Sequence, residues 1–256
     1  MEVINGEWYM DGVSWRDKTC LHSAGELLEL IDEIGFMPLF ANEIPGFSVE
    51  NRTDPKYWWT GDPGRDPWEW RMILARTGKV AYGKFFGNKA GFVSKKWFPY
   101  FANYRRSGYD FDSLYQEGKA SFREKLLMDL FMPEDIEPKD IKKSGLEKKG
   151  CHAELFTFEM KEKAGFGKGG EKNFEGVLAK LQMQTYLVAA DFRPRLNKKG
   201  ESYGWAVAKM TPPEYLWGYK FVTGRYKELP QTSFDKIAKQ LILHYDTDEK
   251  TVRRIL

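Results

Sequence analysis

The chain has 256 residues, of which 42% are hydrophobic and 16% aromatic, and this composition excludes a largely disordered protein. The net charge is only +3, and no apolar run reaches the roughly 20 residues of a membrane-spanning helix, so we expect no membrane contact. Two cysteines (Cys20 and Cys151) exclude a disulfide framework, and residues 1–8 lack the pattern of a secretory signal. We therefore expect a cytoplasmic protein, with a monomer as the default state.

Two helices are predicted in the first third of the chain. Ser23 is a typical N-cap, Glu26 follows at the spacing of a capping box, and Gly35 ends a run of apolar residues at helical spacing. Pro67 is favoured in the first turn of a helix, so the aromatic segment after it predicts a second helix that ends before Gly78.

A strand–turn–strand pattern comes next. Residues 79–86 and 89–93 predict a hairpin, and Ser94 predicts the cap of a helix that continues to about residue 104. The order helix, hairpin, helix is typical of a winged-helix unit, in which the hairpin is the wing.

The second half of the chain repeats this order. The acidic, proline-bounded segment 133–138 is the predicted domain boundary, which gives domains 1–132 and 133–256. We therefore predict an α+β fold of tandem winged-helix domains, the first with a helical extension and the second with terminal helices. The elements predicted after the boundary are short helices at 139–143, 154–163 and 174–184, strands at 185–192 and 203–208, and helices at 233–244 and 248–256.

The distribution of charge suggests a polyanionic partner. Residues 79–109 contain seven basic side chains and no acidic one, although the whole chain is nearly neutral. A local basic face is compatible with phosphate binding, and an ordinary solvated face is the alternative. The predicted phosphate contacts to double-stranded DNA are Lys79, Lys84, Lys89, Lys95, Lys96, Arg105, Arg106, Lys168, Lys172, Lys198 and Lys199.

Two short elements are candidates for contact with bases. Trp58 and Trp59 lie in an aromatic segment that could stack on bases or form part of the core. Gln182 and Gln184 flank one apolar residue where a helix meets a strand, so in extended chain both amides would point to one side. Such a pair could orient a water molecule, or it could satisfy backbone groups at the helix end.

Several other kinds of site are not indicated. The three histidines are far apart in the sequence and neither cysteine has a CxxC partner, so we expect no structural zinc site and no metal. The glycine-rich segment 165–172 lacks the spacing of a phosphate-binding loop, and no cofactor is expected.

Five segments carry a resemblance to a known family. From about residue 35 to 217 the sequence resembles the AlkZ-type alkylpurine DNA glycosylases and their YcaQ relatives, and more closely the shorter AlkZ-related proteins. The resemblance implies stacked winged-helix domains and DNA repair by hydrolysis of the N-glycosidic bond of alkylated bases. The segments that carry it are 35–43, 58–63, 66–71, 82–86 and 167–176.

The resemblance also implies a catalytic glutamine pair early in the chain, facing a positively charged DNA channel. At that position this sequence has Phe40 and Asn42, followed by Glu43, and the literal match is the late pair Gln182 and Gln184. Either the site has moved, or Asn42 and Glu43 perform altered chemistry, or the scaffold only binds DNA. The alternatives to a glycosylase are thus a non-catalytic DNA-binding or regulatory protein and a winged-helix protein that binds other proteins.

Overall fold

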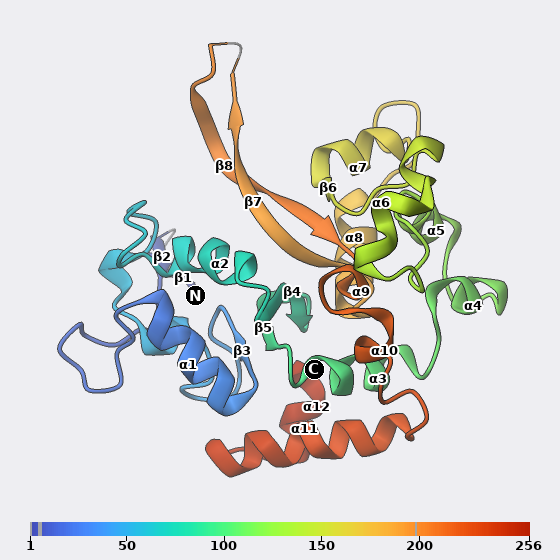
Figure 1. Ribbon diagram of the computed structural model, residues 1–256. Coiled ribbons are helices and arrows are strands. Elements are labelled where there is room, and N and C mark those ends of the chain that lie inside the picture. Colours follow the sequence, from blue (N-terminus) through green and yellow to red (C-terminus); the bar gives the residue numbers. More distant parts are fainter. Residues whose placement is uncertain (1, 5–6, 198) are drawn as a thin grey trace. The chain divides into compact units, whose positions relative to one another are not determined.

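The computed structural model describes residues 2–4, 7–197 and 199–256, and the chain divides into two compact units (Figure 1). Unit 1 comprises Met1–Tyr100 and Gln231–Leu256, and unit 2 comprises Phe101–Pro230. Each unit combines helices with antiparallel strands, which confirms the mixed α+β class.

The predicted boundary after residue 132 lies inside unit 2. The backbone N–H of Met132 donates to the carbonyl of His152 (3.2 Å), and the N–H of His152 donates to the carbonyl of Leu130 (2.9 Å). The hydroxyl of Tyr215 also donates to the Met132 carbonyl. Because these bonds tie both sides of the acidic segment together, that segment is an internal part of unit 2 and not a linker.

In unit 1 the strands β3, β5 and β4 form an antiparallel sheet in that spatial order. Phe36 pairs with Val93, and Tyr82 pairs with Phe92. Because Phe92 and Val93 are consecutive in β5, the two pairs lie on opposite faces of the sheet, and both faces are buried. The elements of unit 1 are β1 (Glu2–Ile4), β2 (Glu7–Tyr9), α1 (Ala24–Ile34), β3 (Phe36–Pro38), 3₁₀ helices at Glu50–Arg52 and Pro55–Tyr57, α2 (Pro67–Arg76), β4 (Val80–Phe86), β5 (Lys89–Ser94), the start of α3 (Phe98–Arg106), α11 (Pro230–His244) and α12 (Glu249–Ile255).

The helix ends of unit 1 follow from local side chains. The Ser23 hydroxyl accepts from the backbone N–H of Glu26 (3.2 Å) at the start of α1, and Gly35 ends that helix with φ 103°, a region that favours glycine. Asp66 caps α2 by accepting from the N–H of Trp68 (2.8 Å). The predictions for both helices are therefore confirmed.

The predicted helix cap at Ser94 is wrong. Ser94 is the last residue of β5, where it pairs with Val80 and donates its N–H to the carbonyl of Gly35 (2.8 Å). The helix α3 begins only at Phe98. The pairing with Val80 and the bond to Gly35 keep Ser94 in the strand, although a serine at this position locally favours the start of a helix.

In unit 2 the strands β7, β8 and β6 form an antiparallel sheet in that spatial order. The order matches that of β3, β5 and β4 in unit 1, because the short strands β3 and β6 each pair with the second strand of the hairpin that follows them. The elements of unit 2 are the rest of α3, α4 (Phe111–Gln116), α5 (Phe122–Met128), a 3₁₀ helix at Pro138–Asp140, α6 (Ile141–Ser144), a 3₁₀ helix at Leu146–Lys149, β6 (Leu155–Phe156), α7 (Thr157–Lys163), α8 (Phe174–Met183), β7 (Val188–Leu196), β8 (Ser202–Thr211), α9 (Pro213–Trp217) and α10 (Tyr219–Val222).

Two predicted elements of unit 2 differ from the structure. Leu155 and Phe156 fall within a predicted helix, but they pair with Met210 and Lys209 of β8 as strand β6. The strand predicted from residue 185 begins only at Val188, because the backbone before it turns through a positive φ of 67°. In both cases, a tertiary pairing or a turn overrides the local pattern.

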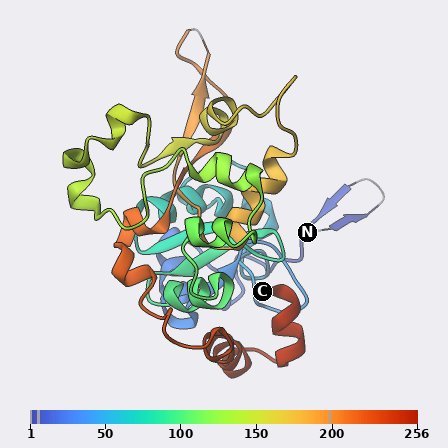
Figure 2. The same ribbon diagram turned by 90° about the vertical axis from the view of Figure 1, so that its right-hand side faces the viewer.

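The hairpin β7–β8 is the longest extended element of unit 2. Two views show it continuing well beyond helices α7 and α8 of the same unit (Figures 1 and 2). Its base lies in the core, where Val188 and Met210 are buried, and toward its far end Arg193, Arg195 and Tyr203 are exposed. The hairpin therefore offers an exposed ribbon on a well-anchored base.

Candidate nucleic-acid interface

The predicted basic residues of unit 1 divide between the two ends of the β4–β5 hairpin. Lys79, Lys95 and Lys96 are exposed at its base, where the N–H of Lys95 donates to the carbonyl of Lys79 (2.8 Å). Lys84 and Lys89 lie toward the turn, and Lys89 Nζ donates to the carbonyl of a neighbouring loop residue (3.2 Å). The lysines are accessible, but they occupy two separate ends of the hairpin.

The two predicted arginines of α3 are structural. Arg106 is 1% exposed, and its Nη1 forms an ion pair with Glu214 (2.5 Å), which is itself fully buried. Arg105 is partly buried and donates through Nη1 to the carbonyl of Met183 (2.8 Å), and burial lowers its pKa to about 10. The prediction that Arg106 contacts DNA phosphates is therefore wrong, because the guanidinium is enclosed by its own unit.

The environment of Arg106 satisfies its guanidinium on several sides. Nε donates to the Thr185 hydroxyl (3.1 Å), Nη2 donates to the Thr185 carbonyl (2.6 Å), and Nη1 also donates to the hydroxyl of Tyr226 (3.0 Å). The guanidinium carbon lies 4.4 Å from the centre of the Tyr186 ring. Burial lowers the pKa of Arg106, and the Glu214 carboxylate more than reverses this, so the arginine stays charged.

Three further predicted lysines of unit 2, Lys168, Lys172 and Lys199, lie in loops. Lys168 and Lys172 are exposed on a glycine-rich loop that closes on itself, since the N–H of Gly167 donates to the carbonyl of Glu171 (3.0 Å). Lys199 is exposed at the end of the β7–β8 hairpin, and Lys198 lies outside the described residues. Lys168, Lys172 and Lys199 are therefore accessible to a phosphate backbone.

The neighbouring tryptophans have different environments. Trp58 is 5% exposed and its indole N–H donates to the hydroxyl of Thr53 (2.9 Å), while its ring packs on Phe40 at a centroid distance of 5.6 Å. Trp59 is 40% exposed, and its backbone N–H donates to Asp66 Oδ1 (3.1 Å). Trp58 therefore belongs to the core, and only Trp59 presents a ring to the surface.

Asn42 and Glu43 are both engaged by unit 1 itself. The Asn42 side chain accepts from the N–H of Ile44 (2.9 Å) and donates to the carbonyl of Phe47 (2.6 Å), so it closes the turn between these residues. Glu43 is exposed, and its carboxylate pairs with Arg254 of α12. Asn42 therefore acts as a turn residue, and Glu43 forms an ion pair at the surface.

The late glutamines are not two residues of an extended chain. Gln182 lies within α8, and its Nε2 donates to the carbonyl of Leu178 one turn earlier (3.3 Å). Gln184 is the C-cap of α8, and its Oε1 is buried without a hydrogen-bond partner among the described residues. The predicted shared direction of the two amides is therefore wrong, and only Gln184 retains an unsatisfied oxygen.

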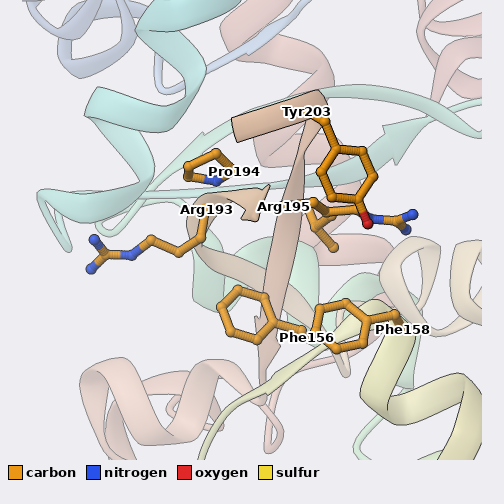
Figure 3. A pocket seen from close by; sticks show the side chains of 7 residues that line it. Phe156, Phe158, Arg193, Pro194, Arg195 and Tyr203 are labelled. Carbon is orange, nitrogen blue, oxygen red and sulfur yellow. The ribbon is translucent and has the colours of Figure 1, made fainter. Parts of the chain in front are cut away.

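A groove of about 390 Å³ lies along the β7–β8 hairpin of unit 2 (Figure 3). Figure 3 shows the Tyr203 ring beside the Arg195 side chain, the rings of Phe156 and Phe158 next to each other, and Arg193 extending away from Tyr203. The groove is lined by Phe156, Phe158, Arg193, Pro194, Arg195, Tyr203 and Val207.

The groove combines stacked rings with exposed cations. The Phe156 and Phe158 rings stack at a centroid distance of 5.4 Å and an angle of 11°, and Phe158 is 47% exposed. Arg195 pairs across the hairpin with Tyr203, which is 51% exposed. Arg193 is exposed as well, although its Nε pairs with Asp191 (2.7 Å). Flat apolar surface beside guanidinium groups suits a ligand that has both rings and phosphates.

Sequence reasoning missed this groove for a local reason. The predicted strand ends at residue 192, which leaves Arg193 and Arg195 in a loop, whereas β7 continues to Leu196 with an irregular register between these two arginines. Phe156 and Phe158 fall within one predicted helix, whereas β6 and the start of α7 present them together. The sequence did contain a signal for a longer hairpin: Arg193 and Arg195 are two residues apart, and Tyr203 follows at the start of the second strand.

The structure was also searched for metal sites and for membrane-spanning helices. Within the described ranges no group of three or more His, Cys, Asp or Glu side chains is placed to hold a metal ion. No helix in the described part of the chain combines the length and hydrophobicity needed to cross a bilayer.

Comparison with known protein families gives a match. The sequence model of the AlkZ-related family matches residues 21–256. No curated protein and no solved structure matches the chain. The match covers nearly the whole chain, including both hairpins and the groove.

Proposed function

Because the chain belongs to the AlkZ-related family, we propose that it is a glycosylase-related DNA-repair protein that binds double-stranded DNA through the β7–β8 hairpin of unit 2. The observation that carries this proposal is the groove, where the Phe156–Phe158 stack lies beside Arg193, Arg195 and Tyr203. The family membership supports the link to DNA repair, and the groove supports the mode of binding.

The strand order supports a winged-helix interpretation of each unit. In a winged-helix domain a short strand near the first helix pairs with the last strand of the wing, and β3 with β5 and β6 with β8 have this relation. The wing of unit 2 is then β7–β8. A two-stranded ribbon of this kind fits a groove of duplex DNA, where it can position basic side chains on both phosphate backbones.

The chemistry of the groove suits nucleic acid. The planar guanidinium of Arg195 can bind a phosphate with two parallel hydrogen bonds, and Arg193 retains its terminal nitrogens for the same purpose. Stacking on an aromatic ring contributes about 1–3 kcal/mol for each base. A cavity of about 390 Å³ falls within the range of about 300–1,000 Å³ that is typical of small-ligand pockets, so it admits one exposed base.

Fluorescence anisotropy with a labelled duplex at several salt concentrations tests this function. We expect affinity to fall with salt, and the log–log slope to lose about 0.9 for each phosphate contact removed, so about 2 in the double variant Arg193→Ala/Arg195→Ala. The matched control is Lys220→Ala/Lys227→Ala, which removes two exposed charges of unit 2 outside the groove. Equal slopes for the two double variants would refute the proposed interface.

Hydrolysis of the N-glycosidic bond is the second candidate, and Gln184 favours it. Its Oε1 is buried without a hydrogen-bond partner among the described residues, so a movement that exposes the end of α8 would let it accept a hydrogen bond from a water and orient that water toward the sugar carbon. An alkylated purine is a cationic leaving group, so its departure requires no strong acid. Flipping the nucleotide out of the duplex would cost a few kcal/mol of unstacking.

A base-release assay on duplex DNA containing an N-methylated purine tests this second function. We expect Gln184→Ala to abolish release and Asn42→Ala to retain it, because the Asn42 amide is already used in its turn. Absence of release by the unaltered protein would leave DNA binding without catalysis as the function.

A further inference from the structure

A second, larger cavity of unit 2 has the opposite character to the groove. It has a volume of about 690 Å³ and contains five carboxyl groups and no basic side chain among its described lining residues. Phosphate groups are repelled by such a site, so it is not part of the proposed DNA interface. The lining residues that matter for binding are Asp110, Asp112, Asp129, Glu134, Met128 and Met132.

Some of these carboxyl groups already have partners. Lys125 pairs with Asp129 (2.5 Å) and with Asp112 (3.5 Å), and all three are at least partly exposed. One oxygen of Asp110 accepts from the hydroxyl of Tyr219 (2.7 Å). The negative charge of the cavity is thus only partly balanced by the protein.

Two carboxyl oxygens have no partner. Glu134 Oε2 accepts from the backbone N–H of Phe111 (3.2 Å), but Glu134 Oε1 is buried and lacks a hydrogen-bond partner among the described residues. The same is true of Asp110 Oδ1 in the described part of the chain. The nearby cation, Arg106, is already bound to Glu214 and directs its hydrogen bonds elsewhere. A buried polar oxygen without a partner is costly, so a ligand that donates to it gains affinity.

The partner these oxygens fit is an organic cation. Burial raises the pKa of the Glu134 carboxyl, and a cation bound beside it favours the ionised form. An ionised carboxyl group only accepts hydrogen bonds, so a ligand that satisfies both oxygens must supply the N–H donors itself. The remaining wall of the cavity is apolar, with buried Phe111, Met128, Phe131 and Met132. Rings and methionine side chains contact a flat, polarisable group favourably.

We propose that this acidic cavity binds a small planar organic cation of the amidinium or guanidinium class, held between Asp110 and Glu134. The cation donates paired hydrogen bonds to Asp110 Oδ1 and Glu134 Oε1, and its flat body lies against the apolar wall. Charge-assisted hydrogen bonds of this geometry are stronger than neutral ones, which gives the charged ligand its preference over an uncharged analogue.

Isothermal titration of the full chain with benzamidine and with benzamide tests the proposal, because the two probes differ in charge and hardly in shape. We expect benzamidine to bind at least about tenfold more tightly than benzamide, and Glu134→Gln and Asp110→Asn each to remove about tenfold or more of that affinity. Glu175→Gln, on the exposed face of α8, is the matched control and should bind as the unaltered protein does. Equal affinities for the two probes, or unchanged binding in Glu134→Gln, would overturn the proposal.

Two further measurements test where the cation binds and how large a ligand the cavity accepts. The methyl resonances of Met128 and Met132 should shift with benzamidine in the unaltered protein, which locates the bound cation without a substitution; unshifted methyl resonances would overturn the proposal. Agmatine should bind more tightly than N-acetylarginine N-methylamide, because the cavity is sized for a free small molecule. Tighter binding of N-acetylarginine N-methylamide would indicate a peptide arginine as the ligand and would overturn the proposal of a small free cation.

Discussion

Replacing Arg106 by methionine should destabilise unit 2 far more than replacing an exposed arginine. The substitution removes an ion pair with Glu214 at 2.5 Å and three further hydrogen bonds to Thr185 and Tyr226. Four bonds to a charged group at about 1.5–3 kcal/mol each would total about 6–12 kcal/mol if they were additive. Because methionine keeps apolar contact with the Tyr186 ring, we expect a loss of about 3–5 kcal/mol, which is usual when one partner of a buried pair is removed.

The structure offers a matched control at the same separation. Arg123 pairs with Glu171, also at 2.5 Å and also in unit 2, but their side chains are 47% and 33% exposed. Arg123→Met should therefore cost about 1 kcal/mol or less. Urea unfolding followed by circular dichroism measures both changes in the free energy of unfolding. If Arg106→Met costs no more than Arg123→Met, burial does not determine the strength of this pair and the reasoning is refuted.

Three further sets of variants probe the pH dependence of stability, the burial of the tryptophans and the turn at Asn42. Burial raises the pKa of Glu134 to about 8 from 4.5, so the folded protein holds a proton that the unfolded chain has released between these values. The free energy of unfolding should then fall as pH rises from about 4.5 to about 8, by at most about 1.4 kcal/mol per unit, and pH titration of urea midpoints should show a flatter dependence in Glu134→Gln. Trp58→Ala should cost about 3–5 kcal/mol because the ring is buried, whereas Trp59→Ala should cost about 1 kcal/mol or less; similar midpoint shifts in thermal unfolding would contradict this assignment. Asn42→Ala should cost about 1–2 kcal/mol in the same assay through the lost turn bonds, and an unchanged midpoint would show that the turn does not need its amide.

Local signals were sufficient where a single side chain decides a helix end or a tight turn. Ser23 and Gly35 delimit α1 through bonds within a few residues, and the hairpin of β4 and β5 turns at its glycine and asparagine. The mixed α+β class followed from these elements. The end of β5 did not, because Ser94 is held by Gly35, some 60 residues away in the sequence.

The site depended on contacts that no local pattern contains. The sequence does not show whether a basic side chain is exposed to water or paired with a buried carboxylate. Arg106 was therefore grouped with the exposed lysines, although its ion pair with Glu214 lies in the core. Phe156 lies beside Arg193 and Tyr203 only because β6 pairs with β8 and the hairpin extends past residue 192. The sequence alone therefore determined two things: the secondary structure near helix caps and tight turns, and the resemblance to a family. Burial, and with it the division of charged and aromatic side chains between core and surface, was decided by strand pairing over long sequence distances, since the free energy of a buried group depends on all its neighbours at once.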